Sequence, residues 1–269
     1  MERTNTLKIK RNIIIFVIGT LILSGLGGLL LAGKNDIGSL VFIIGPILMM
    51  IILRTLGRDG WKNAGFKLNF RSKYKWYLLS IIIYPATFFI IIVLGILTGV
   101  ASIEVSTTSF LQLFVTGVVA QFLPRMFFAL CEEFGWRGYL DPQLSLLKIT
   151  DVKRHLIVGL IWAGWHFPLI LSTDYTDIPL KFFLPIFTIG VIITAIVYGQ
   201  IRKYSQSVWP AVIMHGIANT IAFSIIDQQL IVFNNKLLVY LAPESVMVIV
   251  LWLFLGWWLL RCKRSFVQG

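Results

Sequence analysis

Long apolar runs recur along this chain, and they constrain its fold more than any other feature. Eight segments are apolar enough to predict membrane-spanning helices: residues 12–32, 37–53, 76–99, 110–139, 155–173, 180–201, 208–226 and 245–260. A helix needs roughly 20 residues to cross the bilayer core, and only helices or closed barrels satisfy their backbone groups there. These runs are too long for barrel strands. The sequence therefore predicts an all-α, polytopic membrane helix bundle of about eight transmembrane helices.

The fourth segment is too long for one straight crossing, so we expect it to tilt or to bend at Pro124. Composition agrees with a bundle surrounded by lipid, since 57% of the residues are hydrophobic and only 13% are charged. Cys131 lies in an apolar segment and Cys262 in a basic tail, so we expect two free thiols.

The basic residues fall almost entirely on one side of the predicted bundle. If the helices alternate in direction, 19 lysines and arginines share the side of both termini, and the opposite side receives Lys34, Lys181 and Lys236. The positive-inside rule then predicts a multi-pass protein of the cell membrane with both termini in the cytoplasm. Topology and anionic lipid headgroups explain the net charge of +12, so nucleic acid is not an expected partner.

A few polar side chains lie deep within the apolar segments, where ionisable groups are costly and need a reason. They are Arg125, Glu132, Glu133, Arg137, His166, His215 and Asn219. At about 1.5 Å per residue, the positions of Glu132, His166 and His215 lie about 10–16 Å from the cytoplasmic ends of their segments. Three helices therefore bring a carboxylate, two imidazoles and the Asn219 amide to similar depth.

Spacing along the helices refines this prediction. Glu133 and Arg137 are four residues apart, which favours an ion pair, and Glu132 then points elsewhere. His215 and Asn219 also share a helix face. A purely structural reading remains open for each group: a salt bridge for Glu133 with Arg137, and interhelical hydrogen bonding for His215 with Asn219. We expect Arg125 to pair with a carboxylate.

Such a cluster can hydrolyse a peptide bond. Glu132, assisted by His166, could deprotonate a water molecule, and His215 with Asn219 could stabilise the oxyanion that forms. Two histidines and a carboxylate also match a catalytic zinc set with one open position. The residues alone leave both arrangements open.

Three motifs make the cluster recognisable. Glu132-Glu-Phe-Gly-Trp-Arg137 resembles the Glu-Glu-x-x-x-Arg motif of the CPBP family, which comprises CAAX proteases and bacteriocin-processing or abortive-infection-like proteins. Trp162-x-x-x-His166 is similar to its second motif, usually Phe-x-x-x-His, and His215-x-x-x-Asn219 to its third. The order and spacing agree over about residues 110–226.

The resemblance implies an intramembrane endopeptidase that uses a glutamate-activated water. Because this mechanism needs no metal, we favour one without a cofactor, with zinc as the alternative. It implies roles for Glu132 as base, His166 as its partner, and His215 with Asn219 as the oxyanion site; we add Glu133 and Arg137 to the catalytic set. The expected substrate is a membrane-associated peptide or protein. Short loops resemble those of bacterial members, which process peptides or serve in bacteriocin immunity, so a prenylated protein is not the favoured substrate.

The expected organisation has three parts: residues 1–109 with three helices, residues 110–226 as the catalytic core, and residues 227–269 with a last helix and a basic tail. The competing interpretation is a non-enzymatic immunity or scaffold protein, or a proton-coupled transporter, because buried acids and histidines also relay protons. Paired broken helices or repeats, typical of many transporters, are not evident in the sequence.

Overall fold

Helices make up most of the protein in the computed structural model, which describes residues 2–262, with side chains from residue 5 onward. Seven helical stretches in this range are long and apolar enough to cross a membrane. Their elements are α1 (Glu2–Ala32), α2 (Ile37–Thr55), α3 (Phe70–Leu97), α4 (Thr107–Gly135) continuing through η1 (Trp136–Leu140) and α5 (Asp141–Leu146), α6 (Asp151–Ser172), α7 (Leu180–Ser205) and α8 (Trp209–Ile226). The prediction of a polytopic helical membrane bundle is confirmed.

The eighth predicted segment forms α9 (Val246–Arg261), an apolar helix shorter than the others. It packs against α7 and α3, so it belongs to the bundle. Lys263 and Arg264, two of the basic residues counted above, lie outside the described residues, as does the side chain of Arg3.

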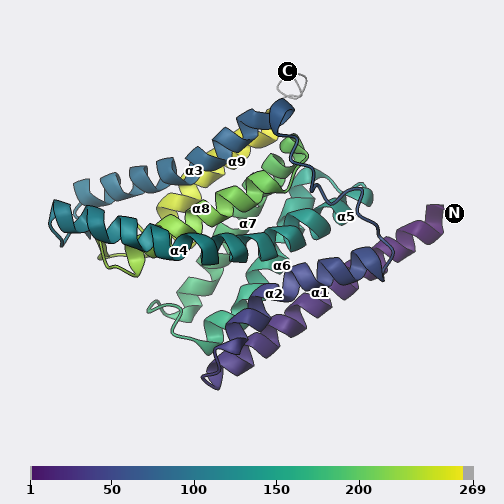
Figure 1. The fold of residues 1–269 in the computed structure, drawn as a ribbon, viewed down its shortest axis with the longest axis horizontal. Helices are drawn as coiled ribbons and strands as arrows, with labels where there is room; N and C mark the ends of the chain where they lie inside the picture. The colour runs from purple at the N-terminus through teal and green to yellow at the C-terminus, as the bar shows by residue number, and fades with distance from the viewer. Residues whose placement is uncertain (1, 263–269) are drawn as a thin grey trace.

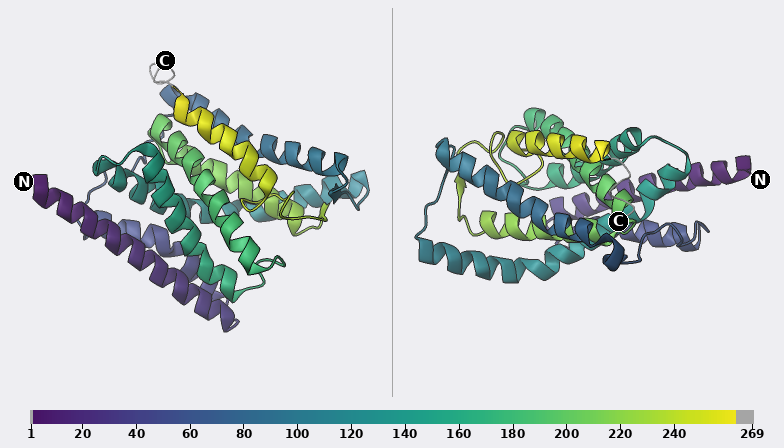
Figure 2. Two further views of the ribbon diagram at one scale, coloured as in Figure 1. Left: turned by 180° about the vertical axis from the view of Figure 1, so that it is seen from behind. Right: turned by 90° about the horizontal axis from the view of Figure 1, so that it is seen from above.

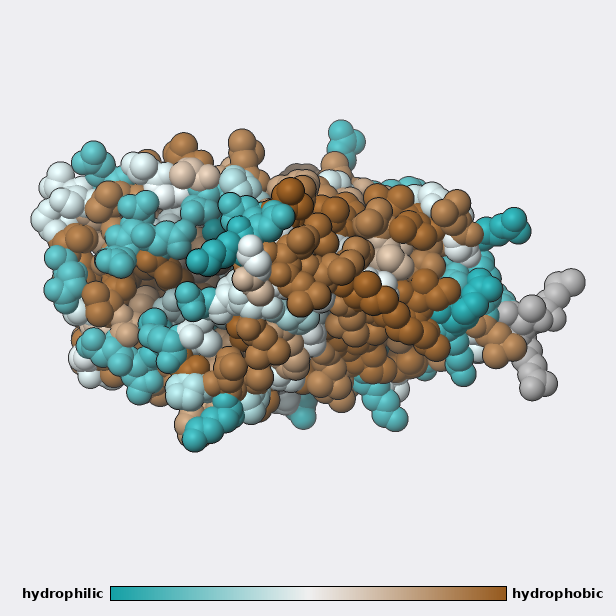
Figure 3. Space-filling view, turned by 90° about the horizontal axis from the view of Figure 1, so that it is seen from below, coloured by the Kyte–Doolittle hydropathy of each residue, from teal (hydrophilic) through white to brown (hydrophobic). Residues whose placement is uncertain are grey.

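The helices form two flanks with a central group between them. In Figure 1, α1 and α2 lie along one edge of the bundle and α3 and α9 along the opposite edge. The contacts follow this order: α1 packs on α2 and α6, α4 on α2 and α8, α6 on α7, and α7 on α9. Two views from other directions show the same arrangement (Figure 2). One face carries a broad hydrophobic band with hydrophilic residues gathered on either side of it, as expected for a surface in contact with lipid (Figure 3).

Two buried apolar clusters hold the bundle together, and α7 contributes to both. Phe183 and Phe187 of α7 join a cluster with residues of α1, α2, α4 and α6. Tyr198 and Ile201 of the same helix join a second cluster with residues of α3, α8 and α9. Since opposite faces of α7 are buried, this helix sits centrally, and the predicted site residues lie where the two clusters meet.

The fourth predicted segment differs most from expectation. The helix runs through Pro124 and continues past residue 139, with a π-helical turn at Trp136–Leu140 before α5. At the other end of the bundle, β1 (Ala101–Ser102) pairs antiparallel with β2 (Val232–Phe233) and ties two loops together. The two-stranded link places the segment that follows α8 beside the segment that precedes α4.

Candidate active site

Glu132 and Glu133 lie near the end of α4, and both are buried. The π-helical turn follows directly and carries Arg137, whose Nη1 donates to Oε1 of Glu133 at 3.1 Å. Both partners are fully buried, so the ion pair predicted from their spacing is present in a dry environment. Adjacent carboxylates thus face different partners, as the 100° rotation per helical residue requires.

The Glu132 carboxylate receives contacts from two other helices. Trp162 of α6 donates its indole Nε1–H to Oε2 of Glu132 at 2.8 Å. Nε2 of His215, on α8, lies 3.9 Å from Oε1. Three helices, α4, α6 and α8, therefore meet at this one carboxylate.

His215 is oriented by the second glutamate. Its Nδ1 lies 2.9 Å from Oε1 of Glu133. Because an ionised carboxylate can only accept, Nδ1 carries a proton in this hydrogen bond. The ring therefore directs Nε2 toward Glu132, which gives Glu133 a positioning role behind the site.

His166 is oriented by the backbone of its own helix. Its Nδ1 donates to the carbonyl oxygen of Trp162 at 2.9 Å. A neutral ring with its proton on Nδ1 leaves Nε2 as an acceptor. His166 is half-buried and Glu132 is buried. Within the part of the chain that the structure describes, the imidazole within 4.0 Å of the Glu132 carboxylate belongs to His215 rather than His166.

A cavity of about 240 Å³ joins these groups. Glu132, His166, His215 and Asn219 all line it, and most of the remaining wall is aromatic or aliphatic. Glu133 and Arg137 do not line it and lie behind it. The structure thus brings four of the six predicted site residues to one cavity and places the other two in a supporting layer.

Aromatic residues have a larger part in the site than the sequence analysis assigned to them. The Arg137 guanidinium lies over the ring of Trp162 at 4.4 Å and over that of Tyr198 at 4.7 Å from the ring centroids. Such cation–π contacts stabilise a buried charge. The second motif had already included Trp162, though without a role in the chemistry, whereas Tyr198 carries no signal in the sequence.

Arg125 also lines the cavity, but the prediction of a carboxylate partner is wrong. Its Nε donates to Oε1 of Gln121 at 2.9 Å, and its guanidinium lies 3.4 Å from the centroid of the Phe223 ring. Among the described residues no carboxylate lies within ion-pair distance of Arg125; Gln121 links it to Asp227, whose charge acts on the guanidinium from farther away. A glutamine and an aromatic face take the place of the expected ion pair.

The far rim of the cavity is built from connecting segments. Tyr175 follows α6, and Leu241 with Pro243 precedes α9. Tyr175 is 42% exposed, whereas Glu244, next to Pro243, is buried. Burial raises the pKa of the Glu244 carboxyl to about 7. These connecting segments thus add a phenol to the lining of the cavity.

The donor set does not fit a metal site as it stands. In residues 2–262, no group of three or more histidine, cysteine or acidic side chains is arranged to hold a metal ion. His215 Nδ1 is engaged by Glu133 and His166 Nδ1 by a backbone carbonyl, so Nε2 is the nitrogen left free on each ring. The lack of a grouped donor set among the described residues, and not these hydrogen bonds, is what argues against a metal ion.

Comparison with known proteins finds similarity over this part of the chain. A family model described as type II CAAX prenyl endopeptidase Rce1-like matches residues 122–221, which include every predicted site residue. CAAX prenyl protease 2 of Methanococcus maripaludis is 32% identical over 111 residues, covering 36% of this chain and 39% of the relative. The match thus spans about two fifths of that relative's length. Residues 122–221, which hold all three motifs, are thus similar to the Rce1-like type II CAAX prenyl endopeptidases, in agreement with the resemblance that the motifs indicated.

Proposed function

We propose that the protein is an intramembrane endopeptidase that hydrolyses a peptide bond with a water molecule activated by Glu132. The observation that carries this proposal is the placement of Glu132, His166, His215 and Asn219 around one buried, largely apolar cavity. A carboxylate that lines such a cavity can meet a water molecule and a substrate carbonyl there, which makes Glu132 the candidate general base.

The hydrogen bonds support a division of roles. Glu132 takes the proton from water, and the acceptor Nε2 of His166 assists it on the same cavity wall. His215, when protonated, presents Nε2–H as a donor to the oxyanion, and Asn219 adds an amide one turn further along α8. Glu133 and Arg137 hold His215 from behind.

The proposed substrate is a peptide or protein segment in or on the membrane. An apolar cavity among membrane helices suits a hydrophobic segment. The M. maripaludis relative is named a CAAX prenyl protease, so a prenylated CAAX peptide belongs among the substrates to be tried. The chain's short loops led us to favour a non-prenylated peptide.

Proteolysis by the purified protein tests the proposal. Fluorogenic membrane peptides, with and without a prenyl group, are offered to the wild type, to Glu132→Gln and to Glu104→Gln. Glu104 is the control, because its carboxylate is exposed in the loop before α4 and does not line the cavity. We expect turnover to fall about 10²–10⁴-fold in Glu132→Gln alone and to be unchanged by a strong chelator. Chelator sensitivity reversed by zinc would replace the metal-free mechanism, and equal turnover in the two variants would remove Glu132 from the chemistry.

We also propose that both termini face the cytoplasm, because most basic residues share that side. Labelling of intact cells with a membrane-impermeant maleimide tests this orientation after Cys262→Ser. Glu104→Cys should label, and Lys153→Cys should label only after the cells are opened. The opposite pattern would invert the orientation.

A further inference from the structure

A second cavity, of about 950 Å³, lies at the end of the bundle where α6 begins and α7 ends. Its walls come from the segment between α2 and α3, from α5, and from those two helix ends. None of its lining residues lines the cavity around Glu132. It is therefore a separate feature, at the side predicted to face the cytoplasm.

The lining is strongly cationic. Its basic residues are Lys62, Lys67, Arg154, Arg202 and Lys203, and its acidic residue is Asp141. Asp141 pairs with Arg154, and Lys203 pairs with Asp151. Among the described residues, Lys62, Lys67 and Arg202 have no carboxylate within ion-pair distance. Three positive charges thus line the cavity without an ion pair, and the Asp141 carboxylate, already paired with Arg154, acts on Arg202 only from a longer distance.

Arg202 is fixed in place with part of its guanidinium unused. Its Nε donates to the carbonyl oxygen of Arg137 at 3.1 Å, and its Nη2 donates to that of Asn63 at 3.0 Å. The guanidinium packs against Gly65, where a Cβ would lie 2.3 Å from Nη2 and the φ angle is +75°. A guanidinium has five N–H groups, so donors remain for a ligand.

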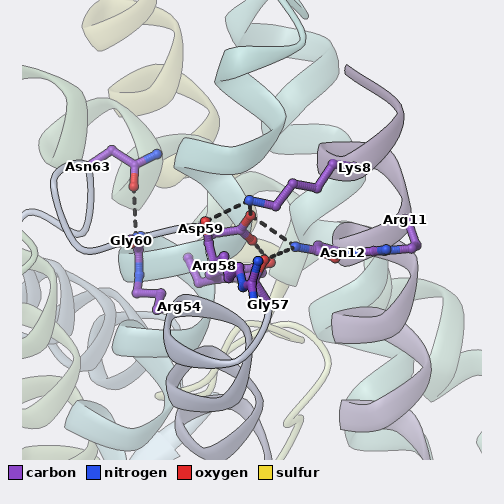
Figure 4. Close-up of polar contacts among 10 residues, drawn as sticks. Lys8, Arg11, Asn12, Arg54, Gly57, Arg58, Asp59, Gly60 and Asn63 are labelled. Atoms are coloured by element: carbon purple, nitrogen blue, oxygen red, sulfur yellow. Dashed lines mark hydrogen bonds and ion pairs between the residues drawn. The ribbon is translucent and has the colours of Figure 1, made fainter. Parts of the chain in front are cut away.

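The segment that carries the two lysines is also held firmly. Asn12 of α1 donates to the carbonyl oxygen of Gly57 at 3.0 Å and to Asp59 at 2.9 Å, and Lys8 contacts Asp59 (Figure 4). Arg54 reaches the Gly60 carbonyl and, at 2.8 Å, the side chain of Asn63. The wall of the cavity is therefore built before any ligand binds, which lowers the ordering cost of binding.

Exposed apolar side chains flank the cationic lining. Trp61 and Leu146 line the cavity and are largely exposed, and Leu68 beside it is 58% exposed. Exposed tryptophan and leucine next to basic residues are typical of the membrane–water interface. Basic pockets between helices on the cytoplasmic side can bind anionic headgroups.

We propose that this cavity binds a phosphate-bearing anion through Lys62, Lys67 and Arg202, with an anionic phospholipid headgroup as the ligand that the apolar flank favours. The same charges would accept a soluble phosphate, so the two sources share one chemistry. A ligand bound to Arg202 would also contact the helix of Glu132 indirectly, because Arg202 donates to the carbonyl oxygen of Arg137 in the π-helical turn that continues this helix. This binding does not depend on protease activity, because it is measured through the thermal stability of the folded protein.

Thermal unfolding of the purified full-length chain in neutral detergent tests it. Phosphatidylglycerol, phosphatidylcholine or inorganic phosphate is added to the wild type, to Lys62→Gln/Lys67→Gln and to the matched control Lys10→Gln/Lys153→Gln, whose lysines are exposed and lie outside the cavity. A ligand that binds the folded state raises Tm. We expect phosphatidylglycerol to raise Tm by about 5 °C in the wild type and the control, and by less than half of that in the cavity variant.

Each outcome decides the proposal. A shift with inorganic phosphate as large as that with phosphatidylglycerol, lost in the cavity variant, supports the anion site and assigns it to a soluble ligand. An equal loss in both double variants overturns it, because general surface charge would then explain the effect. Equal shifts with phosphatidylcholine and phosphatidylglycerol, or no shift with any addition, also overturn it.

Discussion

In the proposed mechanism, Glu133 acts on the site without lining the cavity. Its Oε1 receives Nδ1 of His215 and Nη1 of Arg137. In Glu133→Gln the oxygen remains, but the negative charge that supports a protonated His215 is lost. We expect kcat to fall on the order of 10²-fold or more, with KM nearly unchanged, in steady-state peptide cleavage.

A stability control separates this role from misfolding. Loss of the Glu133 charge leaves Arg137 buried and unpaired, which costs about 3–5 kcal/mol. Glu133→Gln/Arg137→Met removes that penalty, so its Tm should recover while its kcat stays low. Recovery of both together would show that Glu133 acts only on folding.

Counting along the helices could predict that side chains of different helices converge, but not which atoms touch. A fixed rise per residue put Glu132, His166 and His215 at similar depth, and all three line one cavity. The hydrogen bond from Trp162 to Glu132 and the stacking of Arg137 on Tyr198 could not be predicted. They depend on helix rotation and interhelical distance, which hydropathy does not encode.

Among the elements, the π-helical turn at Trp136–Leu140 was the feature that the sequence concealed. Arg202 donates to the carbonyl of Arg137, and Arg54 donates to that of Gly138. Both arginines were counted as ordinary loop or helix-end charges in the topology prediction. An irregular turn stabilised by side chains from two distant elements leaves no local pattern.

The crossing of α2 and α4 predicts a strong effect of a single methyl group. A Cβ on Gly135 would lie 2.4 Å from Cβ of Pro46, too close for either helix to stay in place. We expect Gly135→Ala to destabilise the fold by about 1–3 kcal/mol, measured by thermal unfolding in detergent. Turnover should also fall, because Glu132 lies one turn earlier on α4.

Gly25→Ala on α1 is the matched control for this substitution, since nothing lies within 4 Å of its Cβ position. It should be neutral or stabilise the fold by up to about 1 kcal/mol, through helix propensity. If both substitutions have the same effect on Tm, close packing at Pro46 is not the cause.

For the whole molecule, the bundle was the most predictable feature, because apolar length and the alternation of basic loops act on every helix at once. The exception is α9, whose 16 residues give about 24 Å of helix, less than a bilayer core. Its packing on α7, rather than its length, makes it part of the bundle. Hydropathy alone could not supply that contact.

Global stability should depend on pH through Glu244, in the segment that joins α8 to α9. Its side chain is buried, one carboxylate oxygen has no hydrogen-bond partner among the described residues, and burial raises its pKa from 4.5 to about 7. Between these pH values the folded state binds more protons than the unfolded state, so stability falls as pH rises. The contribution is complete below about pH 4.5 and lost above about pH 7, and it amounts to about 3 kcal/mol.

Glu244→Gln removes this titration and keeps the side-chain shape. The variant should match the wild type at pH 5 and exceed its stability at pH 8, measured as the difference between their Tm values. Asp177→Asn is the control: Lys236 lowers the pKa of the exposed Asp177 carboxyl, so this substitution should give a constant difference over the same range. If the Glu244→Gln difference in Tm is also constant from pH 5 to pH 8, Glu244 stays ionised in the folded protein over this range. Burial would then not raise the pKa of its carboxyl.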